Sequence, residues 1–320
     1  MAAQKKTSEF ARIARIQRLL ENGASTARGI EIGIGDDAAV LRADGRCVWT
    51  VDAQVEGVHF DRRWLSLEDI GYRSFQAAAS DLAAMGARPL GALSSLALPR
   101  ELSEPNLRRI VQGQARAARE CGCPIIGGNL ARAGELSLTT TLLGKVERPL
   151  LRSDAKAGDE LWLVGDIGLA ALGLFALSHG TRGSASVRHC VGVWRRPRAL
   201  LREGALLVGR ARAAIDISDG LAGDAGHLAA ASGVQLTFDA DELEATLSPH
   251  LLSSARELGL SALELAVRGG EDYALLCSGP AERRPRFARP IGHVGRGQGV
   301  WLERAGRRKK LSGSFDHFAR

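Results

Sequence analysis

Gly33-Ile34-Gly35-Asp36-Asp37 is the stretch around which the chain is organised, and the apolar run 38–41 follows it directly. Its two glycines leave the backbone free to turn tightly. Its two neighbouring carboxylates repel each other, and each raises the pKa of the other unless a cation satisfies them. Because such pairs are also common in solvated loops, the turn indicates a metal site only if the chain repeats the pattern.

The chain does repeat the pattern, since acidic residues stand beside glycines or at the predicted ends of apolar strands in later segments. Together with the first turn, the candidate carboxylates are Asp36, Asp37, Asp52, Asp81, Asp216, Asp219, Glu271 and Asp272. Asp81 lies near the C-terminal end of a predicted helix, where its charge opposes the helix dipole and indicates a compensating cation. If most of these side chains converge, the site that they form needs bound cations.

Helical and extended patterns alternate along the chain. Helices are predicted at 8–23, 66–85, 103–120 and 169–177, and strands at 47–51, 91–98, 124–126, 136–143, 160–164, 213–217, 234–238 and 274–277. Strand alternation places Asp216 and Ser218 on one side, with Asp219 at the turn. The irregular pattern between His179 and Arg196 predicts a surface excursion.

Length and composition indicate a soluble globular protein. With 320 residues, the chain is long enough for two domains, each with its own core. Hydrophobic residues make up 45% and charged residues 25% of the sequence. No apolar run approaches the roughly 20 residues that cross a bilayer, and the first residues lack the apolar core of a signal peptide. We therefore expect a cytoplasmic protein with no membrane partner.

Cysteine spacing and charge argue against two other classes of protein. The five cysteines are irregularly spaced without a zinc-finger pattern, so we expect reduced, mostly buried thiols. The net charge of +7 comes mainly from arginines spread along the chain, and aromatic residues make up only 5%. A nucleic-acid surface interleaves basic and aromatic residues. A solvated surface is the favoured interpretation, with a positive field that could help to collect phosphate-bearing small molecules.

Oxygen donors beside glycines predict a particular kind of site. Carboxylates without clustered His or Cys favour a hard cation such as Mg²⁺, which bridges carboxylates to phosphate oxygens. Glycines let phosphates approach backbone N–H groups. The sequence has no Gly-x-x-x-x-Gly-Lys-Ser/Thr loop and no His-Arg-Asp or Asp-Phe-Gly set. We therefore expect a nucleotide phosphate held through several metal ions, at an ATP site of another kind.

Five motifs in a fixed order carry a resemblance to a known family. They are Gly-Ile-Gly-Asp-Asp-Ala (33–38), Asp-x-x-Val-Glu-Gly-Val-His-Phe (52–60), Ser-Asp-Leu-Ala-Ala-Met-Gly-Ala (80–87), Asp-Ile-Ser-Asp-Gly-Leu (216–221) and Gly-Gly-Glu-Asp-Tyr (269–273). The series resembles the thiamine-monophosphate kinase family, in the superfamily of aminoimidazole-ribonucleotide synthetase and selenophosphate synthetase. The likeness runs from the first predicted helix to the ending Phe-Asp-His-Phe (315–318).

The resemblance implies a fold and a reaction. The fold is α/β (α+β), a two-domain aminoimidazole-ribonucleotide-synthetase-like fold with mixed sheets covered by helices and an ATP cleft between the domains. Residues 1–148 would hold metal and ATP phosphates and form a homodimer, and residues 149–320 would complete the ATP and substrate site. The family's reaction passes the γ-phosphate of ATP to thiamine monophosphate, with the help of several Mg²⁺ ions, and gives thiamine diphosphate.

Matching the motifs residue by residue implies roles for individual side chains. Mg²⁺ would be held by Asp36, Thr50, Val51, Asp52, Asp81, Asn129, Asp216 and Asp219. ATP would contact Cys121, Gly128, Asn129, Arg152 and Ser218. Thiamine monophosphate would face His59, Glu271 and Phe315, because an aromatic ring and a carboxylate suit a cationic thiazolium. In-line attack by the substrate phosphate needs no protein nucleophile, so no catalytic base is assigned.

Three positions depart from the family pattern. Asn129 stands where the family usually has an aspartate, which removes a negative charge but keeps one carbonyl oxygen. Val51 lacks a hydroxyl, so its backbone carbonyl is its remaining donor, and Cys121 stands where an aromatic residue usually helps to hold the adenine. Because of these departures, an alternative hypothesis is that the protein is a catalytically weakened paralogue, which binds nucleotide or thiamine phosphates without efficient turnover.

A sister ATP-dependent enzyme of the superfamily is the other alternative. Selenophosphate synthetase needs a reactive cysteine or selenocysteine near its N-terminus, and residues 1–41 contain none. The related hydrogenase-maturation factor carries a C-terminal cysteine, whereas this chain ends Phe318-Ala319-Arg320. Inspection therefore disfavours both enzymes.

Overall fold

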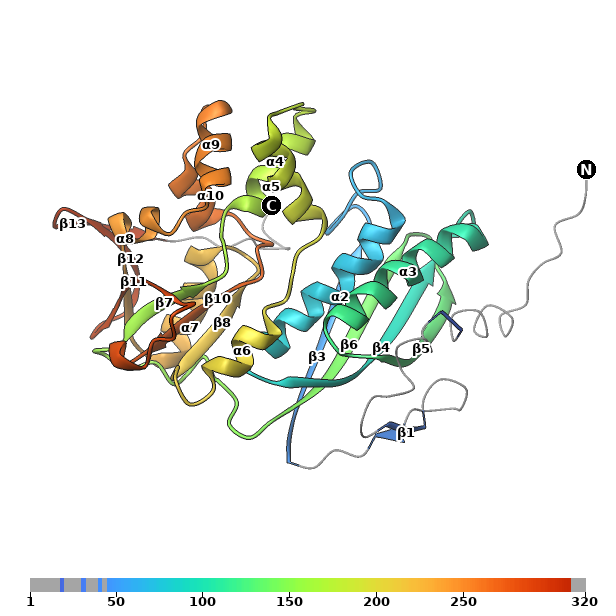
Figure 1. Ribbon diagram of the computed structural model, residues 1–320, viewed down its shortest axis with the longest axis horizontal. Helices are drawn as coiled ribbons and strands as arrows, with labels where there is room; N and C mark the ends of the chain where they lie inside the picture. The colour runs from blue at the N-terminus through green and yellow to red at the C-terminus, as the bar shows by residue number, and fades with distance from the viewer. Residues whose placement is uncertain (1–17, 20–29, 33–39, 42–44, 312–320) are drawn as a thin grey trace, which may run out of the picture. The chain divides into compact units, whose positions relative to one another are not determined.

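A computed structural model describes residues 18–19, 30–32, 40–41 and 45–311 (Figure 1). The chain divides into two compact units, one of Met1–Ala79 and Pro89–Lys145, the other of Ser80–Arg88 and Val146–Arg320. Asp36, Asp37, Phe315 and most of the first predicted helix lie outside the described residues.

The first unit is built on a four-stranded sheet with the strand order β3-β6-β4-β5. The strands are β3 (Arg46–Val55), β4 (Arg88–Leu98), β5 (Ile125–Arg132) and β6 (Ser137–Val146). β4 and β5 run parallel, and a separate antiparallel pair joins β1 (Ile30–Ile32) to β2 (Val40–Leu41). The predicted helices are confirmed as α2 (Leu67–Ala84) and α3 (Glu104–Glu120), which lie on one face of the sheet (Figure 1).

Helices α2 and α3 approach each other closely through two glycines. A Cβ atom on Gly71 would overlap the carbonyl group of Ile110, and one on Gly113 would overlap the carbonyl group of Glu68. The backbone of each helix therefore packs directly against the other. Side chains larger than hydrogen at these two positions have no space unless the helices separate.

Strand β3 continues past the predicted strand end, which corrects the position of Asp52. The strand has 10 residues, and Asp52 lies within it rather than after it. Val51, Ala53 and Val55 continue the extended pattern on both sides of the acidic residue. Trp49 is 69% exposed and Val51 is 64% exposed, so one face of this strand is open.

The second unit is built on a seven-stranded mixed sheet with the order β13-β12-β9-β11-β7-β10-β8. Its strands are β7 (Glu160–Val164), β8 (Ala213–Ile217), β9 (Gln235–Asp239), β10 (Ala274–Gly279), β11 (Arg289–Gly295), β12 (Gly299–Arg304) and β13 (Arg307–Leu311). β12 pairs parallel with β9, whereas β7 pairs antiparallel with β10 and β11.

Helices cover this sheet. They are α4 (Leu169–Ser178), α5 (Ala185–Arg195), α6 (Leu201–Leu207), α7 (Leu221–Ser232), α8 (Ala240–Ala245), α9 (Pro249–Glu257), α10 (Ala262–Arg268) and the 3-10 turn η1 (Ala281–Arg283). In the described part of the chain, no helix is long and apolar enough to cross a membrane.

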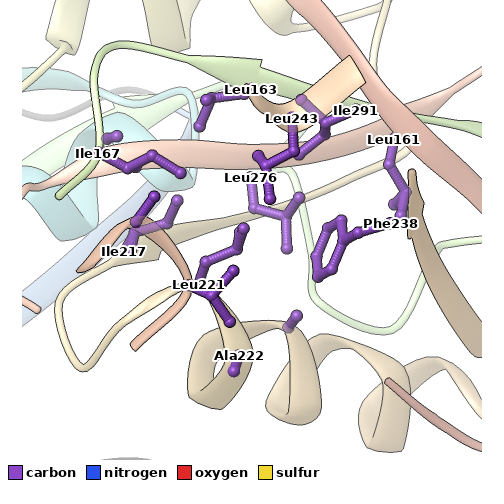
Figure 2. Packing of buried hydrophobic residues seen from close by; sticks show 14 of the residues in the cluster. Leu161, Leu163, Ile167, Ile217, Leu221, Ala222, Phe238, Leu243, Leu276 and Ile291 are labelled. Atoms are coloured by element: carbon purple, nitrogen blue, oxygen red, sulfur yellow. The ribbon is translucent and has the colours of Figure 1, made fainter. Parts of the chain in front are cut away.

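Strands β7, β8 and β10 of the seven-stranded sheet are buried on both faces, which explains why they are apolar along most of their length. Successive residues of a strand point to opposite faces. Leu161 and Leu163 of β7 join one buried cluster together with Leu276 (Figure 2). Trp162 and Val164 of the same strand join a second cluster. Strand β7 therefore lies between two cores.

The predicted surface excursion between residues 179 and 196 is wrong, because this segment contains the packed helix α5. The Ser184 hydroxyl accepts a hydrogen bond from the Val187 N–H and so caps its start. Val187, Cys190 and Trp194 are buried along one side, where α5 packs against α4 and α9. These buried residues recur at i, i+3 and i+7, which is helical spacing, but Gly192 and the β-branched valines of the segment have low helix propensity.

The five cysteines are all free thiols, which confirms that expectation. Cys123, Cys190 and Cys277 are buried, Cys121 is partly buried and Cys47 is exposed. Burial raises the pKa of Cys123 and of Cys277, so these two side chains stay neutral thiols. Their role is packing.

Candidate functional site

Asp216, in the second unit, is the most buried of the predicted Mg²⁺ ligands that the structure describes. It is 4% exposed and accepts a hydrogen bond from the Ser80 hydroxyl at 2.8 Å. Burial and then the charge of Asp81 raise the pKa of Asp216 to about 6, against the lowering effects of Ser80 and the Arg152 charge. A bound cation would relieve this unfavourable burial of negative charge.

Asp224 organises the turn after β8, although the sequence motifs did not single it out. Its Oδ2 accepts hydrogen bonds from the backbone N–H groups of Ser218 and Asp219, both at 3.0 Å. Asp224 is 3% exposed, and burial followed by the charge of Asp216 raises its pKa to about 7. The sequence feature that could have identified Asp224 is its position as a carboxylate in the first turn of α7.

The Gly-Gly-Glu-Asp-Tyr turn is bonded to the turn after β8 through the backbone. The N–H of Glu271 donates to the Ser218 carbonyl at 2.7 Å, and the N–H of Tyr273 donates to the Ile217 carbonyl at 2.9 Å. A Cβ on Gly270 would overlap the Ser218 carbonyl, so only glycine allows this approach. Two acidic motifs that are far apart in sequence therefore form one structure in the second unit.

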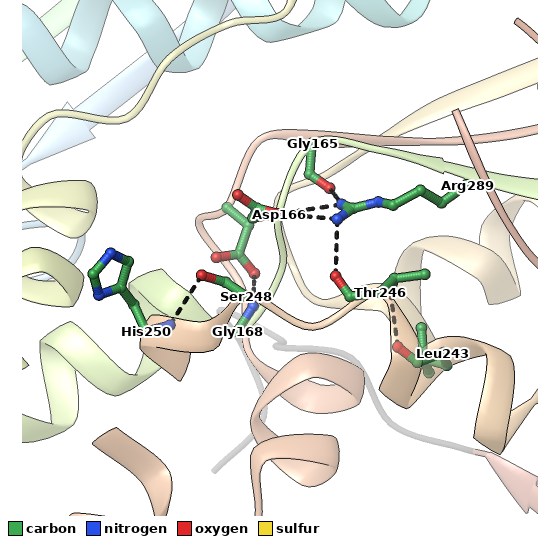
Figure 3. A network of polar contacts seen from close by, with 9 residues as sticks. Gly165, Asp166, Gly168, Leu243, Thr246, Ser248, His250 and Arg289 are labelled. Carbon is green, nitrogen blue, oxygen red and sulfur yellow. Dashed lines mark hydrogen bonds and ion pairs between the residues drawn. The ribbon is translucent and has the colours of Figure 1, made fainter. Parts of the chain in front are cut away.

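Asp272 serves the fold of this region. It is 9% exposed, and it accepts hydrogen bonds from the N–H of Gly168 at 2.6 Å and of Ala170 at 3.0 Å, at the start of α4. Burial raises the pKa of Asp272 to about 7, although both N–H groups lower it. Arg289 holds the same loop by donating to the Gly165 carbonyl and to Asp166 (Figure 3).

Glu271, which the resemblance places at the substrate, has a firmly held side chain. The indole N–H of Trp194 donates to its Oε2 at 2.7 Å. The backbone of Glu271 has a φ of 67°, a left-handed conformation that is uncommon for residues other than glycine. Both the main chain and the carboxylate of Glu271 are therefore constrained.

In the first unit, β3 carries Thr50, Val51 and Asp52. Thr50 and Asp52 share the more buried face, on which the Gln54 amide donates to Oδ2 of Asp52 at 3.2 Å. Val51 points to the opposite, exposed face. A hydroxyl at position 51 would point away from Thr50 and Asp52, so valine removes no side-chain donor from their face.

His59 lies in a tight turn after β3. Its Nδ1 accepts a hydrogen bond from the Val55 N–H at 3.1 Å, and its own backbone N–H donates to the Val55 carbonyl at 2.9 Å. The acceptor role of Nδ1 places the proton of the neutral ring on Nε2. Local contacts thus fix the tautomer and orientation of this imidazole.

Cys121, Gly128 and Asn129 also lie in the first unit. Cys121 follows α3, and its Sγ is 3.6 Å from Oε1 of Gln76. Gly128 and Asn129 lie within β5 rather than at its end, which corrects the predicted strand 124–126. A Cβ on Gly128 would overlap the Ser94 carbonyl, so glycine is required there. Asn129 is exposed on this edge strand.

The donor chemistry of the second unit fits a hard cation. Asp81, Asp216 and Asp219 offer only oxygen atoms, which Mg²⁺ prefers. Burial raises the pKa of Asp216, and the negative charge of Asp81 raises it further. Among the residues that the structure describes, however, no three His, Cys, Asp or Glu side chains are gathered as a complete metal site.

Comparison with known proteins gives matches over both units. The profile of the AIR synthase related protein N-terminal domain matches residues 35–146, and that of the C-terminal domain matches residues 156–299. The chain is 32% identical to the thiamine-monophosphate kinase of Aquifex aeolicus over 303 residues, which cover 93% of this chain and 95% of that protein.

Solved structures agree with the sequence matches. AaThiL complexed with AMPPCP and TMP has a TM-score of 0.81 and 32% identity, covering 99% of both chains. Thiamine-monophosphate kinase from Stenotrophomonas maltophilia K279a has a TM-score of 0.81 and 36% identity, covering 92% of this chain and 96% of that one. The two-domain AIR-synthase-like fold with mixed sheets is thus confirmed. The chain belongs to the thiamine-monophosphate kinase family.

Proposed function

We propose that this chain is a cytoplasmic kinase that transfers the γ-phosphate of ATP to thiamine monophosphate and releases thiamine diphosphate and ADP. Family membership supports the reaction, and the similarity to AaThiL, which was solved with AMPPCP and TMP, supports the two substrates. The observation that carries the proposal is the buried Asp216 beside Asp81, near the end of β8, where the turn that follows is bonded to the turn of Glu271. This arrangement suits phosphate groups bound through cations.

Several Mg²⁺ ions would be held by oxygen donors from both units. In the second unit these donors are Asp81, Asp216 and Asp219, and elsewhere they are Asp36, Thr50, Asp52, Asn129 and the carbonyl of Val51. Magnesium would neutralise the charge of the phosphates. The raised pKa of Asp216 supports a cation in the second unit. The domain roles, with metal and ATP phosphates on residues 1–148, belong to the same proposal.

The remaining predicted residues would bind the organic parts of the substrates. Cys121, Gly128, Asn129, Arg152 and Ser218 would contact ATP. His59, Glu271 and Phe315 would contact thiamine monophosphate. Glu271 is suited to a cationic ring, because its carboxylate is negative and oriented.

Transfer requires positioning more than acid–base chemistry. An oxygen of the acceptor phosphate attacks the γ-phosphorus in line, a new P–O bond forms, and the bond to the ADP oxygen breaks. Ser80 holds the Asp216 carboxylate of β8 in place, and Asp224 holds the N–H groups of Ser218 and Asp219 in the turn that follows. Glu271 orients the acceptor. The protein supplies no nucleophile in this scheme.

A labelled-phosphate assay tests the proposed reaction. The full chain is incubated with γ-labelled ATP and thiamine monophosphate across a series of Mg²⁺ concentrations. We expect labelled thiamine diphosphate only when ATP, thiamine monophosphate and Mg²⁺ are all present. Binding of both substrates without transfer at any Mg²⁺ concentration would refute the kinase and favour the weakened paralogue, for which Asn129 is the specific observation.

We also propose a homodimer through the first unit. Strand β3 is an edge strand of the four-stranded sheet, and its exposed face carries Trp49 and Val51. Exposed apolar residues that adjoin one another on a sheet edge are typical of interfaces.

Trp49→Arg is therefore expected to convert the dimer into a monomer, because burying an unpaired charge in an apolar interface is unfavourable. Leu206→Arg is the matched control, since Leu206 is 48% exposed and lies in the second unit. Sedimentation velocity of the three proteins decides the matter. A wild-type monomer, or a Trp49→Arg variant that remains a dimer, would contradict this interface.

A further inference from the structure

Trp194 joins helix α5, which carried no predicted role, to the turn of Glu271. Its indole Nε1–H donates a hydrogen bond to Oε2 of Glu271 at 2.7 Å. Trp194 is 2% exposed, so packing fixes the ring, whereas Glu271 is only partly buried. A donor fixed by the core therefore bonds to a carboxylate that solvent or a ligand can reach.

The backbone of Glu271 is fixed independently of its side chain. Its N–H donates to the Ser218 carbonyl at 2.7 Å, and the next residue, Asp272, is anchored to the N–H groups of Gly168 and Ala170. With the main chain set on both sides, the side-chain torsions of Glu271 decide where its carboxylate points. The indole N–H favours one of these orientations.

We propose that Trp194 is a positioning residue, which holds the Glu271 carboxylate in the orientation that binds the cationic ring of the phosphate acceptor. This inference rests on the proposed function, because a thiazolium-bearing acceptor gives the carboxylate its role. Ordering the carboxylate in advance reduces the entropy lost when the acceptor binds. Loss of the Trp194 hydrogen bond should therefore weaken binding of the acceptor, because Trp194 contacts Glu271 and does not contact the reacting atoms.

Replacing Trp194 by phenylalanine removes the N–H donor and keeps an aromatic ring. We expect the KM for thiamine monophosphate to rise about tenfold, the size expected for losing a hydrogen bond to a charged group. We expect kcat to change by less than about threefold and the KM for ATP by less than about twofold, because binding of the acceptor alone is affected. Steady-state kinetics with each substrate varied in turn measures all three.

Trp162 offers a matched control in the same unit. Its Nε1–H donates to Oε2 of Glu160, also at 2.7 Å, and its ring is fully buried. Glu160 has no proposed contact with either substrate, and it also pairs with Arg284 at 2.8 Å. Trp162→Phe should lower thermal stability about as much as Trp194→Phe and leave the KM for thiamine monophosphate unchanged. Equal KM changes in the two variants would overturn the proposal.

A double-variant cycle tests whether Trp194 acts through Glu271. In a Glu271→Ala background, Trp194→Phe should raise the KM no further, because the carboxylate that it orients is gone. If the two replacements raised the KM for thiamine monophosphate independently, so that their effects on binding free energy added, the proposal would be overturned.

The outcomes also separate this proposal from the proposed function. A wild-type chain that does not phosphorylate thiamine monophosphate would refute the proposed function. An active wild type with a Trp194→Phe variant of unchanged kinetics would refute only the role of Trp194.

A measurement on the wild-type chain covers the case in which Trp194→Phe does not fold. The five tryptophans give five indole N–H signals in a ¹⁵N-labelled protein, and single replacements of the other four assign that of Trp194. Saturating thiamine monophosphate should shift the Trp194 signal and leave the Trp162 signal in place. An unmoved Trp194 signal would overturn the proposal.

Discussion

Asp224→Ala is expected to lower phosphate transfer by at least about 100-fold, the cost of a displacement near 1 Å in a catalytic site. It is also expected to lower the free energy of unfolding by about 2–6 kcal/mol, since two N–H groups lose their acceptor at roughly 1–3 kcal/mol each. Those groups belong to Ser218 and Asp219, in the turn that carries proposed metal and ATP contacts.

Asp224→Asn is the matched variant, and it should keep most of the activity and stability. Both N–H groups bond to a single oxygen, Oδ2, so one amide carbonyl oxygen can accept both hydrogen bonds. Urea unfolding and the labelled-phosphate assay measure the two effects. Should Asp224→Asn be as damaging as Asp224→Ala, the position needs its negative charge, and the hydrogen-bonding explanation is wrong.

Gly71→Ala is expected to lower the free energy of unfolding by about 3 kcal/mol or more, at the upper end of the usual cost of overpacking. Its Cβ would overlap the Ile110 carbonyl, which belongs to the backbone of α3 and cannot turn aside like a flexible side chain. The helices α2 and α3 must separate to admit the methyl group. The apolar contacts between them are then lost along with the close approach.

Gly226→Ala controls for the general effect of a methyl group on a helix. Gly226 is also helical, in α7, and a Cβ there would have no atom within 4 Å. This variant should be neutral or more stable by up to about 1 kcal/mol, because alanine favours the helix. Urea unfolding of both variants provides the comparison. Equal stability of Gly71→Ala and wild type would show that the two helices can move apart without cost.

The sequence predicted the elements whose pattern is regular. Strand 213–217 was found because a short apolar run indicates a buried strand, and the helix near 66–85 was found because its alanine-rich sequence favours a helix. Helix α5 was missed because its valines and Gly192 have low helix propensity, although its buried residues follow helical spacing. The place of Asp52 was also wrong, since a carboxylate on a half-open strand does not end it when the residues beyond it still favour extension.

Only part of the candidate site could be predicted from the sequence motifs. The motifs named Asp216 and Glu271, and the structure shows that their two turns are bonded together. They did not name Asp224, which accepts hydrogen bonds from Ser218 and Asp219, or Trp194, which donates to Glu271, 77 positions further along the chain. Such partners depend on how helices and turns that are distant in sequence pack together, and a local sequence pattern does not contain this information.

Helix α2 has a consequence for the history of the gene. Its residues up to Ala79 belong to the first unit, whereas Ser80–Arg88 belong to the second, where the Gly204 backbone packs on the Ala83 carbonyl. A recombination crossover near residue 146 would exchange most of the second unit between parents but leave Ser80–Arg88 behind. A chimera made this way would carry Asp81 and Ala83 from one ancestor against Asp216 and Gly204 from another. The two halves of this protein are therefore expected to have been inherited together.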